Sequence, residues 1–377
     1  MTVATRTLWI GTYPHAASDA PEGVWRVEVD VEQGAFGGAL LAAATPSPSF
    51  LALTAPAAPG DPATRTLYAV GETEEGTVAA FGVAADGALV PHGPAVPTGG
   101  AFPCHVVARP GEVLVANYGD GVLSVVRTDA SGALVPDARL QRHAGGGPDA
   151  ERQEGPHAHF VADDGEGGVL VVDLGTDEVR RHDPAAPDGA APRVVATLPP
   201  GTGPRHVAAL PGGHLVVVGE LDPALFVLAP AGDGRYDVVA RYDATFAVAP
   251  DGARSFPSHV DVTADGTRVV VGVRGADVLA VHAVEPGPEG GAPRLRHLGD
   301  SPTGGAWPRH LAVLLPGDAQ EPTHDLVVVA NQEDDPLAGG PEGFSSNLAL
   351  LRVRRSDGLG EVLDVLALPA PACVVEA

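Results

Sequence analysis

A proline followed two residues later by a histidine recurs along the chain, and each copy opens a short apolar run. The four full copies begin at Pro103, Pro204, Pro257 and Pro308. Looser copies are Pro48-Ser49-Phe50 and Pro156-His157-Ala158-His159. Successive copies lie about 50 residues apart, an interval typical of one propeller blade or a similar repeated unit. The repeat therefore indicates a closed array of like units, and we expect residues 1–377 to form one domain.

Between the openers the sequence has the pattern of β-strands. Runs of Val and Leu are short and are bounded by Gly, Pro, Asp or Asn, as in residues 169–172 and 215–218. Seven such runs end close to a polar residue. These strand-end residues are Thr12, Glu72, Asn117, Asp173, Glu220, Arg274 and Asn331.

The chain has seven strand-ends but six openers. This difference indicates that one blade is built from strands of both chain termini. Sharing a blade closes the ring and hides the sheet edges that an open array would expose. We expect an all-β fold, a seven-bladed β-propeller of four-stranded antiparallel blades closed by strands from both termini. Residues 362–368 offer a strand for the closure. Six or eight blades are the alternatives.

Charge and cysteine usage exclude several classes of function. The net charge is −25, and all 23 cationic residues are arginine. Without lysine there is no Schiff base and no phosphate-loop lysine. The acidity argues against nucleic acid and anionic membranes as partners. The chain has two cysteines, too few for a disulfide framework, and it shows neither a signal-peptide pattern nor a long apolar run. We therefore expect a cytoplasmic protein. The sequence does not indicate an oligomeric state.

In a propeller the innermost strands line a central channel, and one mouth of that channel is the usual binding site. We interpret the repeated histidines, His105, His206, His259 and His310, as structural, because buried polar groups need partners. The middle position of each opener would then form a ring around the channel. Its members are Ser49, Cys104, His157, Arg205, Ser258 and Arg309.

Departures from the repeat indicate where chemistry could occur. His157 and Arg205 break the pattern of the openers, and Glu220 and Arg274 break that of the strand-ends. Arginines binding carboxylate or phosphate, together with groups that move protons, suit an anionic, oxygen-rich small molecule. We therefore predict catalytic roles for these four. The residues assigned to substrate binding are His159, Arg309, Asn117 and Asn331.

These residues also allow other interpretations. Each arginine could instead form a structural ion pair with Asp173, Asp277 or Glu220. The tandem histidines lack a matching carboxylate or cysteine set, so we predict no metal site and no cofactor. Cys104 is interpreted as a packing residue, and no Gly-x-Ser-x-Gly nucleophile elbow is present.

The ordered set of motifs resembles the lactonase family of seven-bladed propellers, best known for 6-phosphogluconolactonase activity, over essentially the whole chain. Among the stretches that carry the resemblance are residues 10–13 (IGTY), 68–72 (YAVGE), 103–106 (PCHV), 115–119 (VANYG), 156–159 (PHAH), 203–206 (GPRH), 274–277 (RGAD), 307–310 (WPRH) and 330–332 (ANQ). Three features depart from the family pattern. They are Gly71 and Val273, where the family has Asn, and the acidic stretch 333–342.

The resemblance implies an enzyme that hydrolyses a small anionic sugar lactone, most simply 6-phosphogluconolactone in the pentose phosphate pathway. Related fungal enzymes lactonise 3-carboxy-cis,cis-muconate with a histidine, two arginines and a glutamate. By motif those roles fall on His157, Arg205, Glu220 and Arg274. In this scheme Glu220 or His157 activates water, while the arginines stabilise the oxyanion. A non-catalytic binding module and a muconate-type cycloisomerase remain the alternatives.

Overall fold

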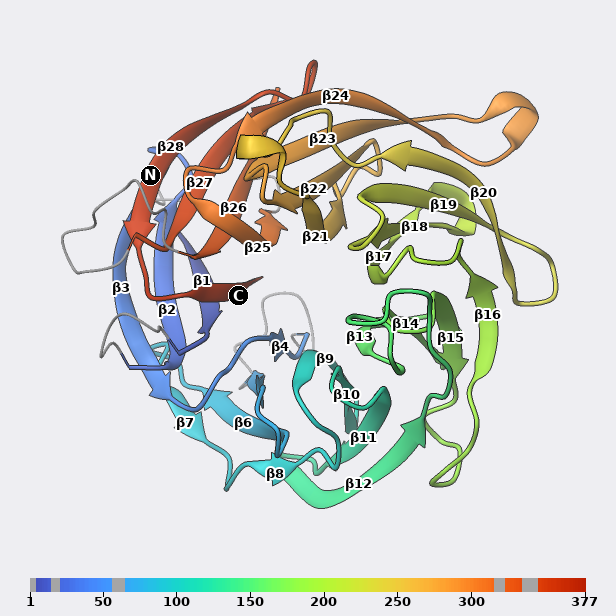
Figure 1. The fold of residues 1–377 in the computed structure, drawn as a ribbon. Coiled ribbons are helices and arrows are strands. Elements are labelled where there is room, and N and C mark those ends of the chain that lie inside the picture. The colour runs from blue at the N-terminus through green and yellow to red at the C-terminus, as the bar shows by residue number, and fades with distance from the viewer. Residues whose placement is uncertain (1–4, 15–20, 56–64, 315–322, 334–344) are drawn as a thin grey trace.

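A computed structural model describes residues 5–14, 21–55, 65–314, 323–333 and 345–377. The chain forms seven antiparallel sheets arranged as blades around one axis, as Figure 1 shows looking along that axis. This confirms the seven-bladed, all-β prediction. Helical structure among the described residues is confined to three short 3-10 turns. These turns are η1 (Pro211–Gly213), η2 (Pro250–Gly252) and η3 (Pro288–Gly290).

Each blade begins with an inner strand beside the axis and ends with an outer strand. The blade that closes the ring contains β29 (Pro371–Glu376), β1 (Thr5–Thr12), β2 (Gly23–Asp30) and β3 (Ala35–Ala44). The next contains β4 (Leu51–Leu53), β5 (Thr66–Gly71) and β6 (Thr77–Val83), with β7 (Leu89–Pro91) and β8 (Val96–Pro97) both paired to β6. The third contains β9 (Pro103–Arg109), β10 (Glu112–Asn117), β11 (Val122–Thr128) and β12 (Leu134–Arg142).

The remaining four blades follow the same order from the axis outwards. The fourth contains β13 (Ala158–Asp163), β14 (Val169–Asp173), β15 (Glu178–His182) and β16 (Arg193–Thr197). The fifth contains β17 (Pro204–Leu210), β18 (His214–Gly219), β19 (Ala224–Pro230) and β20 (Tyr236–Asp243). The sixth contains β21 (Phe256–Val262), β22 (Arg268–Arg274), β23 (Val278–Glu285) and β24 (Arg294–Pro302). The seventh contains β25 (Ala306–Val313), β26 (His324–Glu333), β27 (Asn347–Arg354) and β28 (Gly360–Ala367).

Closure by both termini is confirmed, but the closing strand is not the predicted one. β29 pairs with β1 through Ile10 and Val374, whereas residues 362–367 belong to β28, the outer strand of the seventh blade. The burial of the two strands explains the error. β28 alternates between exposed and half-buried positions, as an outer strand does, while the first four residues of β29 are buried. Pro371 is thus a seventh opener that lacks the histidine.

The hydrophobic core lies between neighbouring blades. The middle strands carry the Val and Leu runs, and one cluster joins Leu8 and Ile10 of the first blade to Val328, Leu348 and Leu350 of the seventh. Burying a Val or Leu side chain stabilises a fold by roughly 1.5–3 kcal/mol. Because each cluster joins two blades, every blade depends on its neighbours.

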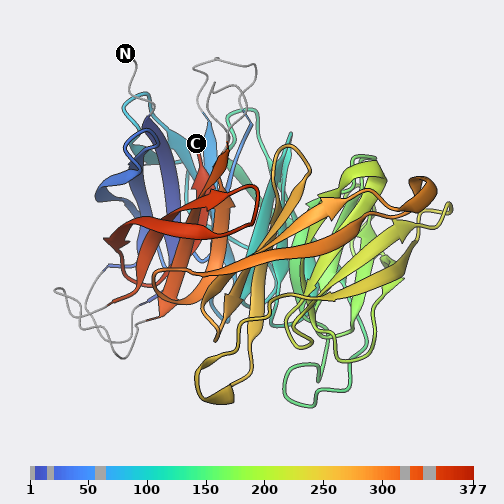
Figure 2. The same cartoon turned by 90° about the horizontal axis from the view of Figure 1, so that it is seen from above.

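All openers point their first residues to the same face of the ring. That face also carries the connections from outer strands to the next inner strand, including residues 143–157 and 244–255. In the side view of Figure 2 these two connections project together from one face. The fold therefore gathers the opener residues, the strand-ends and two long connections at one mouth of the channel.

Candidate active site

Hydrogen-bond register identifies which residue of each opener occupies the middle position. In the fifth blade Pro204 pairs with Gly219 and His206 with Val218, so a bulge leaves Arg205 between them. The fourth blade repeats this geometry with Ala158 and Phe160. His159, not His157, therefore corresponds to Arg205, and Phe160 takes the place of the repeated histidine. The prediction that His157 occupies the middle position was wrong, because the backbone register and not the proline sets the alignment.

The third positions of six openers form a continuous layer of rings across the channel. Neighbouring ring centroids lie 3.9–5.2 Å apart, and Phe50 and His206 meet across the middle at 6.5 Å. The members of this aromatic layer are Phe50, His105, Phe160, His206, His259 and His310. Burial holds the pKa of its four imidazoles below the usual value, to about 3 for His259. Their contacts agree with the structural role predicted for the repeated histidines.

A cavity of about 200 Å³ lies on the opener side of this layer. Its walls come from opener positions, from strand-ends and from the 143–157 connection. The lining residues are Glu72, Cys104, Tyr118, Arg152, His159, Arg205, Glu220, Arg274 and Arg309. Five of the eight predicted site residues are therefore brought together, and opener and strand-end positions share one mouth.

Glu220 lies at the centre of three guanidinium groups. Its Oε1 accepts a hydrogen bond from Arg152 Nη2 at 2.7 Å, while its Oε2 lies 2.9 Å from Arg205 Nε and 2.8 Å from Arg274 Nη2. Burial alone would raise the pKa of the Glu220 carboxyl. The three arginines outweigh burial and hold it well below its usual value. Glu220 is therefore a carboxylate at neutral pH, with both oxygens engaged.

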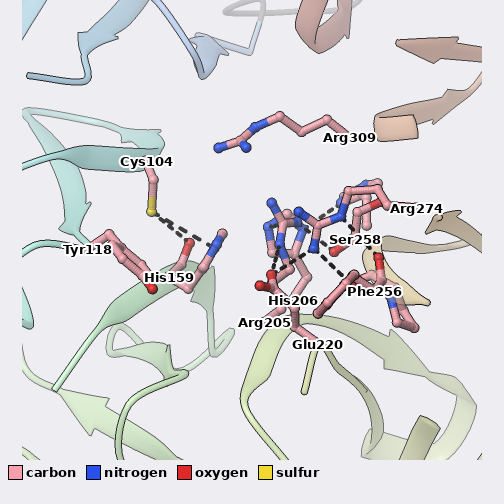
Figure 3. Close-up of polar contacts among 12 residues, drawn as sticks. Cys104, Tyr118, His159, Arg205, His206, Glu220, Phe256, Ser258, Arg274 and Arg309 are labelled. Carbon is pink, nitrogen blue, oxygen red and sulfur yellow. Dashed lines mark hydrogen bonds and ion pairs between the residues drawn. The ribbon is translucent and has the colours of Figure 1, made fainter. Parts of the chain in front are cut away.

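Backbone carbonyls fix the two buried arginines of this cluster. Arg205 Nη1 donates to Ser258 O at 2.6 Å, and Arg274 Nε donates to Phe256 O at 3.0 Å, as Figure 3 shows. Arg274 also lies over the ring of Trp307, with 5.3 Å between the guanidinium carbon and the ring centroid. Within the described part of the chain, Arg205 Nη2 and Arg274 Nη1 have no partner. Two oriented donors are thus left for a ligand.

Burial lowers the pKa of Arg205 to about 9, with the positive charge of Arg274 acting in the same direction. Arg205 nevertheless keeps its charge at neutral pH. Burial, and then the charge of Arg205, holds the pKa of His159 well below its usual value, so its imidazole is neutral.

A second group of polar side chains forms the other part of the cavity wall. Arg309 Nη2 donates to the Tyr13 hydroxyl at 2.5 Å and lies 3.8 Å from Glu72 Oε2. The hydroxyls of Tyr13 and Ser49 both donate to that same Glu72 oxygen. Three blades meet here, because Tyr13 follows β1, Glu72 follows β5 and Arg309 lies in β25.

Cys104 and Tyr118 line the cavity beside His159. The Cys104 thiol donates to His159 O at 3.4 Å and lies 3.9 Å from His159 Nδ1. Burial raises the pKa of this thiol well above its usual value, so it stays protonated and is a poor nucleophile. The predicted packing role of Cys104 fits this environment.

Three predicted site residues lie outside the cavity wall. His157 stacks on Tyr118, with 4.4 Å between ring centroids, and its Nε2 lies 3.2 Å from Glu154. Asn117 is buried and bonds to Ser124 of its own blade and to Thr98 in the connection from the second blade. Asn331 donates to Thr303 O and to Asn347 Oδ1. Both asparagines bond to polar groups of their own blade and of the connection that leads into it.

Four lining residues were not among the predicted site residues. Glu72 and Cys104 stand at strand-end and opener positions, so the repeat itself carried their signal. Tyr118 directly follows the strand-end Asn117. Arg152 lies in the 143–157 connection, where no periodic signal exists. Its placement depends on Gln153, whose buried amide donates to Leu174 O and Asp177 Oδ1.

The departures from the family pattern have different surroundings. A Cβ atom at Gly71 would lie 2.4 Å from Thr77 Oγ1, so this glycine and Thr77 are matched to each other. Val273 is fully buried in the core of the sixth blade. Of the acidic stretch, residues 334–342 lie outside the described residues.

No group of three or more His, Cys, Asp or Glu side chains is arranged to hold a metal ion in the portions of the chain that the structure describes. Among the same residues, no helix has the length and apolar character needed to cross a membrane.

Fold and cavity together define the class: a β-propeller that holds a small, arginine-lined ligand cavity on its axis. The chain belongs to the lactonase family of seven-bladed β-propellers, whose model matches residues 7–375. Among solved structures it is similar to a periplasmic gluconolactonase of Pseudomonas aeruginosa, PpgL, with 26% identity, 99% of each chain covered and a TM-score of 0.79. It is also similar to a candidate 6-phosphogluconolactonase of Bacteroides uniformis, with 25% identity, 99% of each chain covered and a TM-score of 0.79. An uncharacterized protein of Lactococcus lactis, YwcC, is 28% identical over 84% of this chain and 87% of its own length.

Proposed function

We propose that the protein hydrolyses a phosphorylated sugar lactone, 6-phosphogluconolactone, to the open-chain acid. One observation carries the proposal: among the described residues, four arginines and two glutamates line the cavity, an excess of two positive charges in a protein of net charge −25. Such a surplus stabilises an anionic ligand where the rest of the molecule repels it. The proposal places the reaction in the pentose phosphate pathway and the protein in the cytoplasm.

The geometry suits stabilisation of a tetrahedral oxyanion. Arg205 and Arg274 are fixed by backbone carbonyls and by Glu220, and each keeps one terminal nitrogen without a partner among the described residues. In the proposed mechanism these two nitrogens donate to the lactone carbonyl oxygen, whose negative charge grows as water attacks. One such positioned donor contributes on the order of 3 kcal/mol to lowering the barrier.

Cavity size and the relatives support a small sugar-derived substrate. About 200 Å³ is below the roughly 300–1,000 Å³ of pockets for drug-sized ligands. Of the four lining arginines we assign Arg152 to the phosphate, because 37% of its side chain is accessible. The names of two similar structures specify a gluconolactonase and a candidate 6-phosphogluconolactonase.

The test compares freshly made 6-phosphogluconolactone with unphosphorylated gluconolactone, following acid release against the spontaneous rate. We expect the protein to accelerate opening of both lactones and to have the higher kcat/KM for the phosphorylated one. No acceleration of either would refute the proposal. Binding of 6-phosphogluconate without turnover would indicate a binding module. Loss of the ultraviolet absorbance of a muconate would indicate the cycloisomerase instead.

A further inference from the structure

The two glutamates of the cavity have unequal surroundings. Glu220 has both oxygens engaged by three guanidinium groups at 2.7–2.9 Å. Among the described residues, the side chain of Glu72 makes its contacts through Oε2 alone, and the one guanidinium group recorded within 4 Å of it is that of Arg309, at 3.8 Å. When two carboxylates of one site differ in this way, they take different roles in acid–base chemistry.

We propose that Glu72 is the general base that activates water in the lactone hydrolysis, and that Glu220 serves to hold the arginines. This inference rests on the proposed function. Glu72 lines the cavity, and its Oε1 has no partner among the residues that the structure describes. An oriented carboxylate with one unoccupied oxygen is the form that a general base requires.

The structure orients Glu72 on three sides. Its backbone N–H donates to Ser47 O at 3.0 Å, and its Oε2 accepts from the hydroxyls of Tyr13 and Ser49. Burial raises the pKa of Tyr13 well above its usual value, so this phenol keeps its proton and acts as a donor. Arg309 in turn donates to the Tyr13 oxygen. Orientation through Oε2 leaves Oε1 for the water molecule.

The other candidates for the base are less suited. Each oxygen of Glu220 faces at least one guanidinium, which weakens its attraction for a proton. His159 is neutral, but it packs against the Cys104 thiol and lies near Arg205, whose charge opposes protonation of the imidazole. His157 stacks on Tyr118 and is not among the residues that line the cavity.

In the proposed reaction, water attacks the lactone carbonyl while Glu72 acts first as a base and then as an acid. Glu72 Oε1 takes a proton from water as the water oxygen bonds to the carbonyl carbon, and the carbonyl π pair moves to the oxygen beside Arg205 and Arg274. When that pair returns, the bond between the carbonyl carbon and the ring oxygen breaks. The protonated Glu72 gives its proton to the departing alkoxide. The new carboxylic acid then releases one proton to solvent.

The test uses the full chain and freshly made 6-phosphogluconolactone. Glu72→Gln keeps an oxygen that can accept from Tyr13 and Ser49, so the fold should persist. We expect kcat to fall about 10²–10⁴-fold, the usual share of general acid–base catalysis, with a small change in KM. Glu285→Gln, a half-exposed glutamate of the sixth blade, is the matched control and should keep wild-type kcat.

Two further readouts separate a base from a merely structural residue. The pH profile of kcat should change shape in Glu72→Gln and keep its wild-type shape in Glu285→Gln. Formate should restore part of the activity of Glu72→Ala. Active wild type with undiminished kcat in Glu72→Gln overturns the role of Glu72 alone. Inactive wild type overturns the proposed function, and the role of Glu72 with it.

Discussion

Replacing Glu220 by glutamine tests the electrostatic account of the cavity most directly. The substitution keeps the shape of the side chain and removes its charge. Three guanidinium groups that now converge on one carboxylate would face one another without it. Arg205 is nearly fully buried, so solvent screens the remaining positive charges only weakly.

The expected magnitude follows from this burial. Removing one partner of a buried ion pair costs about 3–5 kcal/mol. Glutamine still offers one carbonyl oxygen to the cluster, so we expect the free energy of unfolding at pH 7 to fall by about 3 kcal/mol.

The pH dependence has a definite sign. Because the arginines depress the pKa of Glu220 in the folded protein, its stabilising effect is complete above the unfolded-state pKa, about 4.3 for a glutamate. The effect is lost as the pH falls from there through the folded pKa. The stability difference between wild type and Glu220→Gln should therefore narrow below about pH 4.5.

Urea denaturation of both proteins, followed by intrinsic fluorescence from pH 8 to pH 3.5, measures this difference. Glu361→Gln, an exposed glutamate of β28, is the matched control and should stay within 0.5 kcal/mol of wild type, a range typical of surface substitutions. Equal stability of wild type and Glu220→Gln at pH 7 would refute the reasoning, as would a difference that stays constant down to pH 3.5.

Three other predictions concern single side chains. Arg274→Met should lower kcat/KM for the lactone by roughly 10²-fold or more, since it removes an oriented donor. The control Arg296→Met, on the outer strand β24, should leave kcat/KM unchanged. If both variants lowered kcat/KM equally, the proposed site would be contradicted. Arg152→Met should mainly raise KM for the phosphorylated lactone, because Arg152 is the most exposed cavity arginine of the Glu220 cluster, with 37% of its side chain accessible; an unchanged KM in steady-state assays would exclude it from binding. Cys104 should resist iodoacetamide at pH 8 in the folded protein and react in urea, because burial raises the pKa of its thiol; mass spectrometry that finds rapid labelling of the native chain would count against this environment.

The sequence predicted the ring because the repeat reports on the backbone. Openers and strand-ends recur where the chain enters and leaves the channel, so Arg205, Glu220 and Arg274 could be placed together without coordinates. Register was harder to predict. In Pro156-His157-Ala158-His159 the proline precedes the strand by two residues, and only the pairing of Ala158 with Asp173 shows that His159 faces the cavity.

Residues without periodic signals were missed for physical reasons. Arg152 reaches Glu220 from a connection whose shape depends on the buried amide of Gln153. Asn117 and Asn331 share the strand-end level with Glu220, but their short side chains bond to polar groups of their own blades and of the connections that lead into them. Strand position alone could not separate these two outcomes.

The aromatic layer below the cavity determines how a ligand can enter and leave it. The rings of Phe50 and His206 meet across the axis, and the aromatic layer closes the channel at this level. On the opposite side of the layer, His105 and His259 border a separate depression. In the proposed reaction, substrate and product would therefore both pass through the mouth on the opener side. Bound product would prevent the next substrate molecule from binding, so we expect product inhibition to be competitive with the substrate.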